Sequence, residues 1–190
     1  MIKYIKDSYP EKRNIINIIE SQEYLKENKK YDFFRYIDYV MSRMNIKTIN
    51  YKFIHYSFSR EDYLYHLFNT ISLNKDYIVT FESCVPRIDS VLNITNKEVI
   101  IKNKFLFKIL INSLSSERCK AIIPMSKNAY NIQNELYKNI DERMKNKLLS
   151  KTKILHPPQD INEKIKEFNS EEIVFTFIGS DFYRKGGGKL

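Results

Sequence analysis

Short apolar runs alternate along most of the chain with stretches in which apolar residues recur at helical spacing. Continuous runs are typical of buried strands, and the helical recurrence is typical of helices that pack one face on a core. The clearest strand signals are Tyr77–Phe81, Ala121–Ser126 and Ile173–Ile178, with weaker signals at Lys3–Ile5, Ile49–Tyr56 and Lys153–Leu155. This alternation predicts an α/β domain with a parallel sheet flanked by helices.

The apolar stripes predict helices that begin near Pro10 and include Leu25, cover Phe33–Met44, follow Ser59, cover Lys97–Ser115 and follow Ser126. Ser59 and Asp62 have the spacing of a capping box, in which the two side chains satisfy the first N–H groups of a helix. The buried face of that helix would consist of Leu64, Leu67, Phe68 and Ile71. We expect the stripes of these helices to lie in the core.

The last stretch of the chain carries all four of its glycines and a pair of basic residues. Gly179 ends the apolar run, and Arg184 and Lys185 directly precede Gly186–Gly188. Glycine allows close backbone approach to a ligand, successive amides can form an anion nest, and Arg and Lys donate charged hydrogen bonds to phosphate oxygens. The pattern predicts an anion-binding corner, and a flexible charged terminal segment is the alternative.

The stretch Ile178–Gly186 resembles the opening of the second domain in family 4 (formerly group 1) glycosyltransferases of the two-domain GT-B fold. It is most similar to the variant in lipopolysaccharide-core glucosyltransferases, in which paired Arg and Lys hold the diphosphate of a nucleotide sugar. Many relatives place an arginine directly after the first glycine, where this chain has Ser180. The resemblance therefore implies that Arg184 takes over that role, beside Lys185, Gly186 and Gly187.

In order along the chain, the resemblance extends over Phe53 to Gly188. It implies that residues 1–160 form a Rossmann-like parallel sheet flanked by helices, the acceptor-side N-terminal domain of the GT-B fold. Residues 161–190 would then be a linker and the first strand of a truncated donor-binding domain. First domains of the family usually begin with a strand and a glycine-rich loop, whereas this chain has no glycine before Gly179.

Polar side chains follow two of the predicted strands. Glu82 and Arg87 come after Tyr77–Phe81, and Ser126 ends the run that begins at Ala121. Ligands of open parallel sheets bind at the carboxyl ends of strands, so these residues are candidates for a cleft. An ion pair between Glu82 and Arg87 that only pins the loop is the alternative.

The resemblance also bears on individual residues of this cleft. The family often carries a histidine near the donor sugar in the loop after the equivalent strand, and Glu82 stands at that place. Glu82 is thus the catalytic candidate, although a role taken from that histidine does not transfer directly. His55, at the end of a strand signal, is a further cleft candidate with a structural role as its alternative.

The resemblance implies a retaining hexosyltransferase that uses a nucleotide-diphosphate sugar and acts in polysaccharide, lipopolysaccharide or glycolipid synthesis. Its acceptor would be a glycan or a lipid-linked glycan. Catalysis would depend on positioning both substrates and stabilising the departing diphosphate. We expect no bound cofactor and no metal, and we expect this chain alone to be inactive.

A formal net charge of +9 leaves a different class of function open, a basic module that binds nucleic acid or an anionic membrane surface. Lys97, Lys104 and Lys108 would share one face of the helix predicted over Lys97–Ser115. The opposite arc would hold Val99, Phe105, Leu106 and Ile109. This lysine face is either solvated or in peripheral contact with an anionic membrane, and the chain has no recognisable nucleic-acid motif.

The chain has no apolar segment of signal-peptide or membrane-spanning character, so the cytoplasm is the expected location. Its two cysteines, Cys84 and Cys119, lie far apart without the spacing of a metal site. We expect both to be reduced and buried.

Overall fold

The computed structural model describes residues 2–4, 24–26, 32–44, 53–60, 62–87, 91–94 and 99–157. The predicted domain boundary after residue 160, the strand at Ile173–Ile178 and most of the predicted helix after Pro10 lie outside these ranges. The expected diphosphate-binding residues, Arg184, Lys185, Gly186 and Gly187, lie outside them too.

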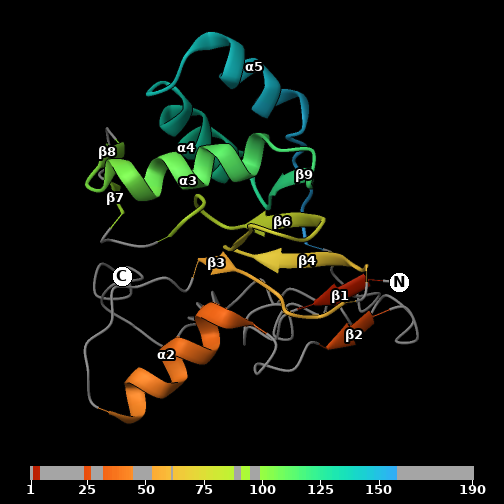
Figure 1. The fold of residues 1–190 in the computed structure, drawn as a ribbon. Helices are drawn as coiled ribbons and strands as arrows, with labels where there is room; N and C mark the ends of the chain where they lie inside the picture. The colour runs from red at the N-terminus through yellow and green to blue at the C-terminus, as the bar shows by residue number, and fades with distance from the viewer. Residues whose placement is uncertain are drawn as a thin grey trace, which may run out of the picture. The chain divides into compact units, whose positions relative to one another are not determined.

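Five parallel strands form the main sheet (Figure 1). In spatial order they are β2 (Tyr24–Lys26), β1 (Ile2–Tyr4), β4 (Leu64–Phe68), β6 (Tyr77–Phe81) and β9 (Cys119–Pro124). Every pairing between neighbours in this sheet is parallel. The expected α/β class, with a parallel sheet and flanking helices, is confirmed. Leu25, however, lies in β2 and not in a helix.

The inner strands β4 and β6 carry much of the core. Tyr65–Phe68 are four consecutive buried residues of β4, and only Ile78 of β6 is more than slightly exposed. A parallel strand covered on both faces has a continuous apolar run and no alternation. That is the pattern from which Tyr77–Phe81 was predicted as a strand.

The helix predicted after Ser59 is wrong. The segment forms β4 and then the short strand β5 (Ile71–Ser72). Its apolar residues fit a helical stripe, but a strand buried on both faces also accepts apolar residues at those positions. Backbone pairing with β1 on one side and β6 on the other gives the strand its place in the sheet.

Two small sheets accompany the main one. β3 (Ile54–His55) pairs in parallel with β5, and β7 (Leu92–Ile94) forms an antiparallel hairpin with β8 (Val99–Ile101). The strand predicted over Ile49–Tyr56 is confirmed for the part that forms β3. The residues before Phe53 lie outside the described ranges.

The helix predicted over Lys97–Ser115 begins later than expected, because β8 occupies its first part. Helix α3 covers Lys104–Ser115, and the Asn103 side chain accepts a hydrogen bond from Leu106 N at 3.0 Å. This cap satisfies one of the N–H groups that a helix start leaves unpaired. With that start, Phe105 is 72% exposed and does not belong to the buried arc.

Helices α4 (Lys127–Tyr137) and α5 (Glu142–Ser150) follow β9. Ser126 caps α4 as predicted, and Asp141 caps α5, which the apolar pattern did not predict. None of the helices in the described ranges has the length and apolar character needed to cross a membrane.

Helix α2 (Phe33–Arg43) forms where its stripe predicts it, but the stripe does not lie in the core. None of its residues is buried, and Phe33, Tyr36, Val40 and Met44 are exposed. The helix is anchored at its start, where Phe33 N donates to Tyr56 O at 2.9 Å and Asp32 caps the first turn.

The predicted strand at Lys153–Leu155 is an extended segment along the free side of β9. Three backbone hydrogen bonds of 2.9 to 3.1 Å join residues 151–155 to Ile122 and Pro124, and Thr152 forms a parallel bridge with Ile122. The segment therefore continues the parallel pairing of the sheet.

Candidate functional site

The carboxyl ends of the parallel strands define the candidate site. Ligands of open α/β sheets bind beyond these ends, next to the point at which the strand order reverses. Here the chain passes from β1 to β2 on one side and later to β4 on the other, so the order reverses between β1 and β4. The carboxyl ends of β4, β6 and β9 are the parts of this edge with described side chains.

Asn69 directly follows β4 and has a φ of 51°. This left-handed conformation is uncommon for residues other than glycine, but asparagine tolerates it well. Its backbone N–H donates to Thr80 O at 2.9 Å, which fixes the turn to the end of β6. Its side-chain Oδ1 is buried without a hydrogen-bond partner. A buried acceptor without a partner is uncommon in folded proteins and sets this turn apart from the rest of the edge.

His66 and Thr80 support this turn from within the sheet. His66 Nε2 lies 3.1 Å from Thr80 Oγ1, and the carbonyl of Thr80 is the acceptor for Asn69 N. Burial lowers the pKa of His66 from 6.5 to about 4, so the imidazole is neutral at neutral pH. A neutral, buried imidazole with a hydroxyl partner positions the strand end and does not serve as a surface base.

The loop after β6 contains the predicted pair. Glu82 Oε2 lies 3.7 Å from Arg87 Nη1, with the Glu82 side chain 18% exposed and that of Arg87 60% exposed. Val85 N donates to Gln133 Oε1 at 2.9 Å, which fastens the loop to α4. The ion pair is long and one partner is exposed, so it contributes little to stability. It does place a carboxylate and a cation together at a strand end.

Cys84 lies in this loop and Cys119 at the amino end of β9, and neither is a candidate nucleophile. Cys84 and Cys119 are both buried and unpaired, as predicted. Burial raises the pKa of Cys84 to about 12 and that of Cys119 to about 11. Because the thiolate is the reactive form, both thiols are inert at neutral pH.

Ser126 lies at the carboxyl end of β9, beside the same loop. Met125 N donates to Phe81 O at 2.9 Å, which joins the ends of β9 and β6. Ser126 Oγ accepts a hydrogen bond from Ala129 N at 3.0 Å, so the hydroxyl is occupied as a helix cap. The positive end of α4 thus opens at this edge.

Glu82, Arg87 and Ser126, which were predicted as cleft residues, therefore lie along one edge with Asn69. Sequence reasoning missed Asn69 because the preceding run was interpreted as a helix. The signal was an asparagine directly after an apolar run, which is also how a strand ends in a turn.

His55 belongs to a different part of the fold. It is buried in β3, with Nδ1 3.1 Å from Ser72 Oγ and its ring centroid 4.8 Å from that of Tyr65. The structure gives His55 the packing and hydrogen bonding of a structural histidine between β3, β5 and β4.

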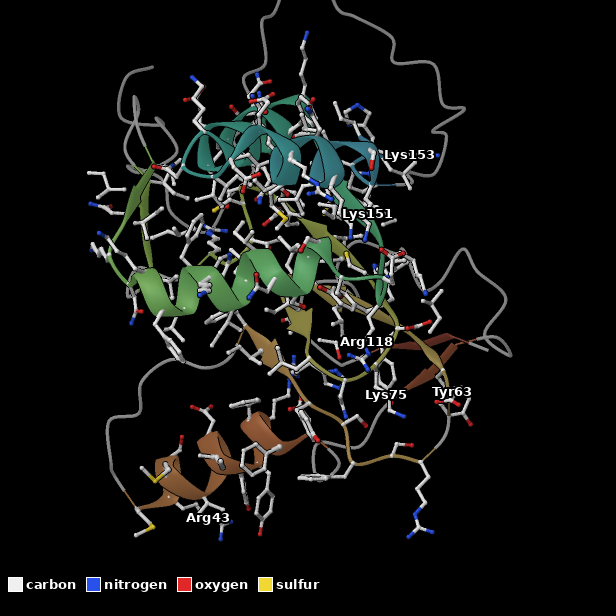
Figure 2. All side chains as sticks on the ribbon, turned by 45° about the horizontal axis from the view of Figure 1, so that its top comes forward. Arg43, Tyr63, Lys75, Arg118, Lys151 and Lys153 are labelled. Atoms are coloured by element: carbon white, nitrogen blue, oxygen red, sulfur yellow. The ribbon has the colours of Figure 1, made fainter. Side chains whose placement is uncertain are left out.

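A cavity of about 340 Å³ lies at the opposite, amino ends of the strands. Its lining includes Tyr63, Lys75 and Arg118, which Figure 2 shows near one another, together with Asp62, Leu64, Asn74 and Asp76. Lys75 pairs with Asp62 at 3.7 Å, and Asp76 pairs with Lys120 at 2.9 Å. Its charges are thus largely compensated, and we assign the functional site to the carboxyl edge.

Within the described ranges, no group of three His, Cys, Asp or Glu side chains is placed to hold a metal ion. No family model, curated protein or solved structure matches the chain.

Proposed function

We propose that the chain is the acceptor-side part of a retaining glycosyltransferase of the GT-B, family 4 type. It would transfer a hexose from a nucleotide-diphosphate sugar to a glycan or a lipid-linked acceptor in the cytoplasm. The observation that carries the proposal is the shared carboxyl edge, where the loop after β6 and the Ser126-capped start of α4 meet. In the family that the chain resembles, the equivalent segments face the cleft between the two domains.

The strand order supports a Rossmann-like domain within that fold. With the two small sheets set aside, the main strands lie in the order second, first, third, fourth and fifth along the chain. This is a common order of doubly wound nucleotide-associated sheets. The extended segment 151–155 adds another parallel element beside β9 before the chain leaves the described ranges.

The carboxyl edge offers contacts for an acceptor sugar. Glu82, whose side chain is 18% exposed, can orient or deprotonate a sugar hydroxyl. Arg87, 60% exposed, has further N–H donors directed to solvent for an acceptor or donor oxygen. The donor diphosphate is assigned to Arg184 and Lys185, with Gly186 and Gly187 allowing close backbone approach.

The proposal has a direct test in the binding of a nucleotide diphosphate. Lys185→Ala and Arg184→Ala should each weaken nucleotide-diphosphate binding by about 1.5–3 kcal/mol, the scale of a hydrogen bond to a charged group. Lys189→Ala, beyond the glycines, is the matched control and should bind like the parent. Equal affinity in all three variants would remove the diphosphate assignment.

A second experiment separates chemistry from loop structure. Glu82→Gln should lower the transfer rate by about 10²-fold or more if the carboxylate handles a proton. Arg87→Met removes the other half of the ion pair but keeps the carboxylate, and should chiefly affect substrate affinity. If Glu82→Gln transfers sugar at the parental rate, Glu82 has only the loop-pinning role.

A further inference from the structure

The start of α3 exposes an apolar side chain among lysines. Phe105 is 72% exposed in the first turn of the helix, and Lys104 and Lys108 beside it are exposed as well. Lys104 and Lys108 are four residues apart and Phe105 and Lys108 three apart, so all three side chains share one helix face. The other face of α3 is buried through Leu106, Leu110 and the residues that follow.

The β7–β8 hairpin extends this surface. Figure 1 shows the hairpin at the N-terminal end of α3. The two are joined because Val91 O accepts hydrogen bonds from Lys102 N at 2.8 Å and Asn103 N at 3.4 Å. Ile100 of β8 is 47% exposed, and Lys102 is exposed in the turn between strand and helix. We call Ile100, Lys102, Lys104, Phe105 and Lys108 the hairpin–helix corner.

The charge of this corner has one sign. The sequence contains no Asp or Glu from Val99 to Ser116, and the β7 strand has none. Helix α4, which also contacts β8, begins with Lys127 and Asn128, and its acidic residue Glu135 is paired with Lys138 at 2.8 Å. Lys102, Lys104 and Lys108 have no acidic partner on these neighbouring elements. In the cavity at the amino ends of the strands, by contrast, the charges are largely compensated.

We infer that the hairpin–helix corner docks on the surface of an anionic lipid bilayer. Lysines attract the negative headgroups, and an exposed aromatic or aliphatic side chain between them enters the boundary between headgroups and acyl chains. α3 is twelve residues long and buries its other face in the core, so it can lie on a bilayer and not cross it. The corner shares no residue with the carboxyl-edge site, and its test is independent of the proposed sugar transfer.

The test measures binding of the full chain to vesicles of phosphatidylglycerol with phosphatidylcholine, and to vesicles of phosphatidylcholine alone. We expect sedimentation only with the anionic vesicles, falling as salt rises. The double substitution Lys104→Gln with Lys108→Gln should weaken the partition about thirtyfold, because each lysine near an anionic surface strengthens binding about fivefold. Phe105→Ser should weaken it about tenfold through the lost apolar contact.

Matched controls use exposed residues elsewhere. Arg143→Gln with Lys153→Gln makes the same change in net charge, and Leu155→Ser removes an apolar side chain that is 62% exposed. Both should bind like the parent, and circular dichroism should show the same fold for every variant. Equal binding to both vesicle types, or equal losses in the controls, would overturn the inference.

A nucleic-acid surface is the remaining outcome of this test. In that outcome the chain would bind an oligonucleotide and would not bind the vesicles. The lysine variant would lose oligonucleotide affinity, whereas Phe105→Ser would keep it. The corner would then not be a membrane surface. The inference therefore depends on the vesicle binding measured for Phe105→Ser.

Discussion

Tyr77 Oη and Ser113 Oγ lie 2.7 Å apart in the core, between β6 and α3. Ser113 Oγ is also 2.7 Å from Ser72 O, to which it donates. Because the serine proton is used for that bond, the tyrosine hydroxyl is the donor to Ser113. One serine thereby links strand β6, helix α3 and the small strand β5.

This chain of hydrogen bonds predicts unequal costs for its two ends. Tyr77→Phe removes one bond and should reduce the free energy of unfolding by about 1 kcal/mol. Ser113→Ala leaves the buried tyrosine hydroxyl without its acceptor and Ser72 O without this donor, and should cost about 2–3 kcal/mol. In urea unfolding, the double variant should cost less than the sum of the two. Additive costs would show that the bonds are independent.

A second prediction concerns the end of α3. Lys151 Nζ donates to Ser116 O at 2.6 Å and Ser115 O at 3.3 Å, and the last turn of α3 contains no basic residue of its own. A cation at the negative end of a helix stabilises it. Lys151→Met should lower the unfolding free energy by about 1–2 kcal/mol. Lys153→Met, exposed on the same segment, should change it by less than about 0.5 kcal/mol.

The burial of His66 predicts a pH dependence. Its folded pKa of about 4 is below the unfolded value of 6.5, so the folded state binds fewer protons between these values. The free energy of unfolding is therefore highest above about pH 6.5. It falls as the pH drops toward 4, by at most about 3 kcal/mol. A plot of the unfolding free energy of His66→Gln against pH should have a smaller slope in this window than that of the parent. The same slope in both proteins would assign the effect to another group.

Both thiols should be silent in the folded protein. The raised pKa values of Cys84, to about 12, and Cys119, to about 11, predict slow reaction with a disulfide reagent at about pH 8. The two cysteines should react fully once the chain is unfolded in urea. Cys84→Ser and Cys119→Ser identify the responsible residue if one thiol reacts early, which would contradict its burial.

Local signals made part of the fold predictable from the sequence. Tyr77–Phe81 is a compact apolar run, and Ser126 precedes a helix with the side chain that caps it. Neither depends on distant parts of the chain. The candidate residues Glu82 and Ser126 could be named for the same reason, since they directly follow these strands.

The errors arose where distant contacts choose between two local structures. The run Leu64–Phe68 has apolar residues that suit a helix as well as a buried strand, and the flanking strands decide between them. The misinterpretation also hid Asn69. Phe105 was misplaced because the predicted helix included Val99 in its apolar arc, whereas Val99 lies in β8 and α3 buries the face that carries Leu106, Leu110 and Leu114. Helix α5 is largely polar, with only Leu148 buried, and gave little signal.

The segment 151–155 also protects the sheet. An edge strand presents unpaired N–H and C=O groups that can recruit a strand from another molecule and start aggregation. Hydrogen bonds from this segment occupy Ile122 N, Ile122 O and Pro124 O on the outer side of β9. A protease that removed the chain from Lys151 onward would uncover β9, so the remaining protein should be less soluble as well as less stable.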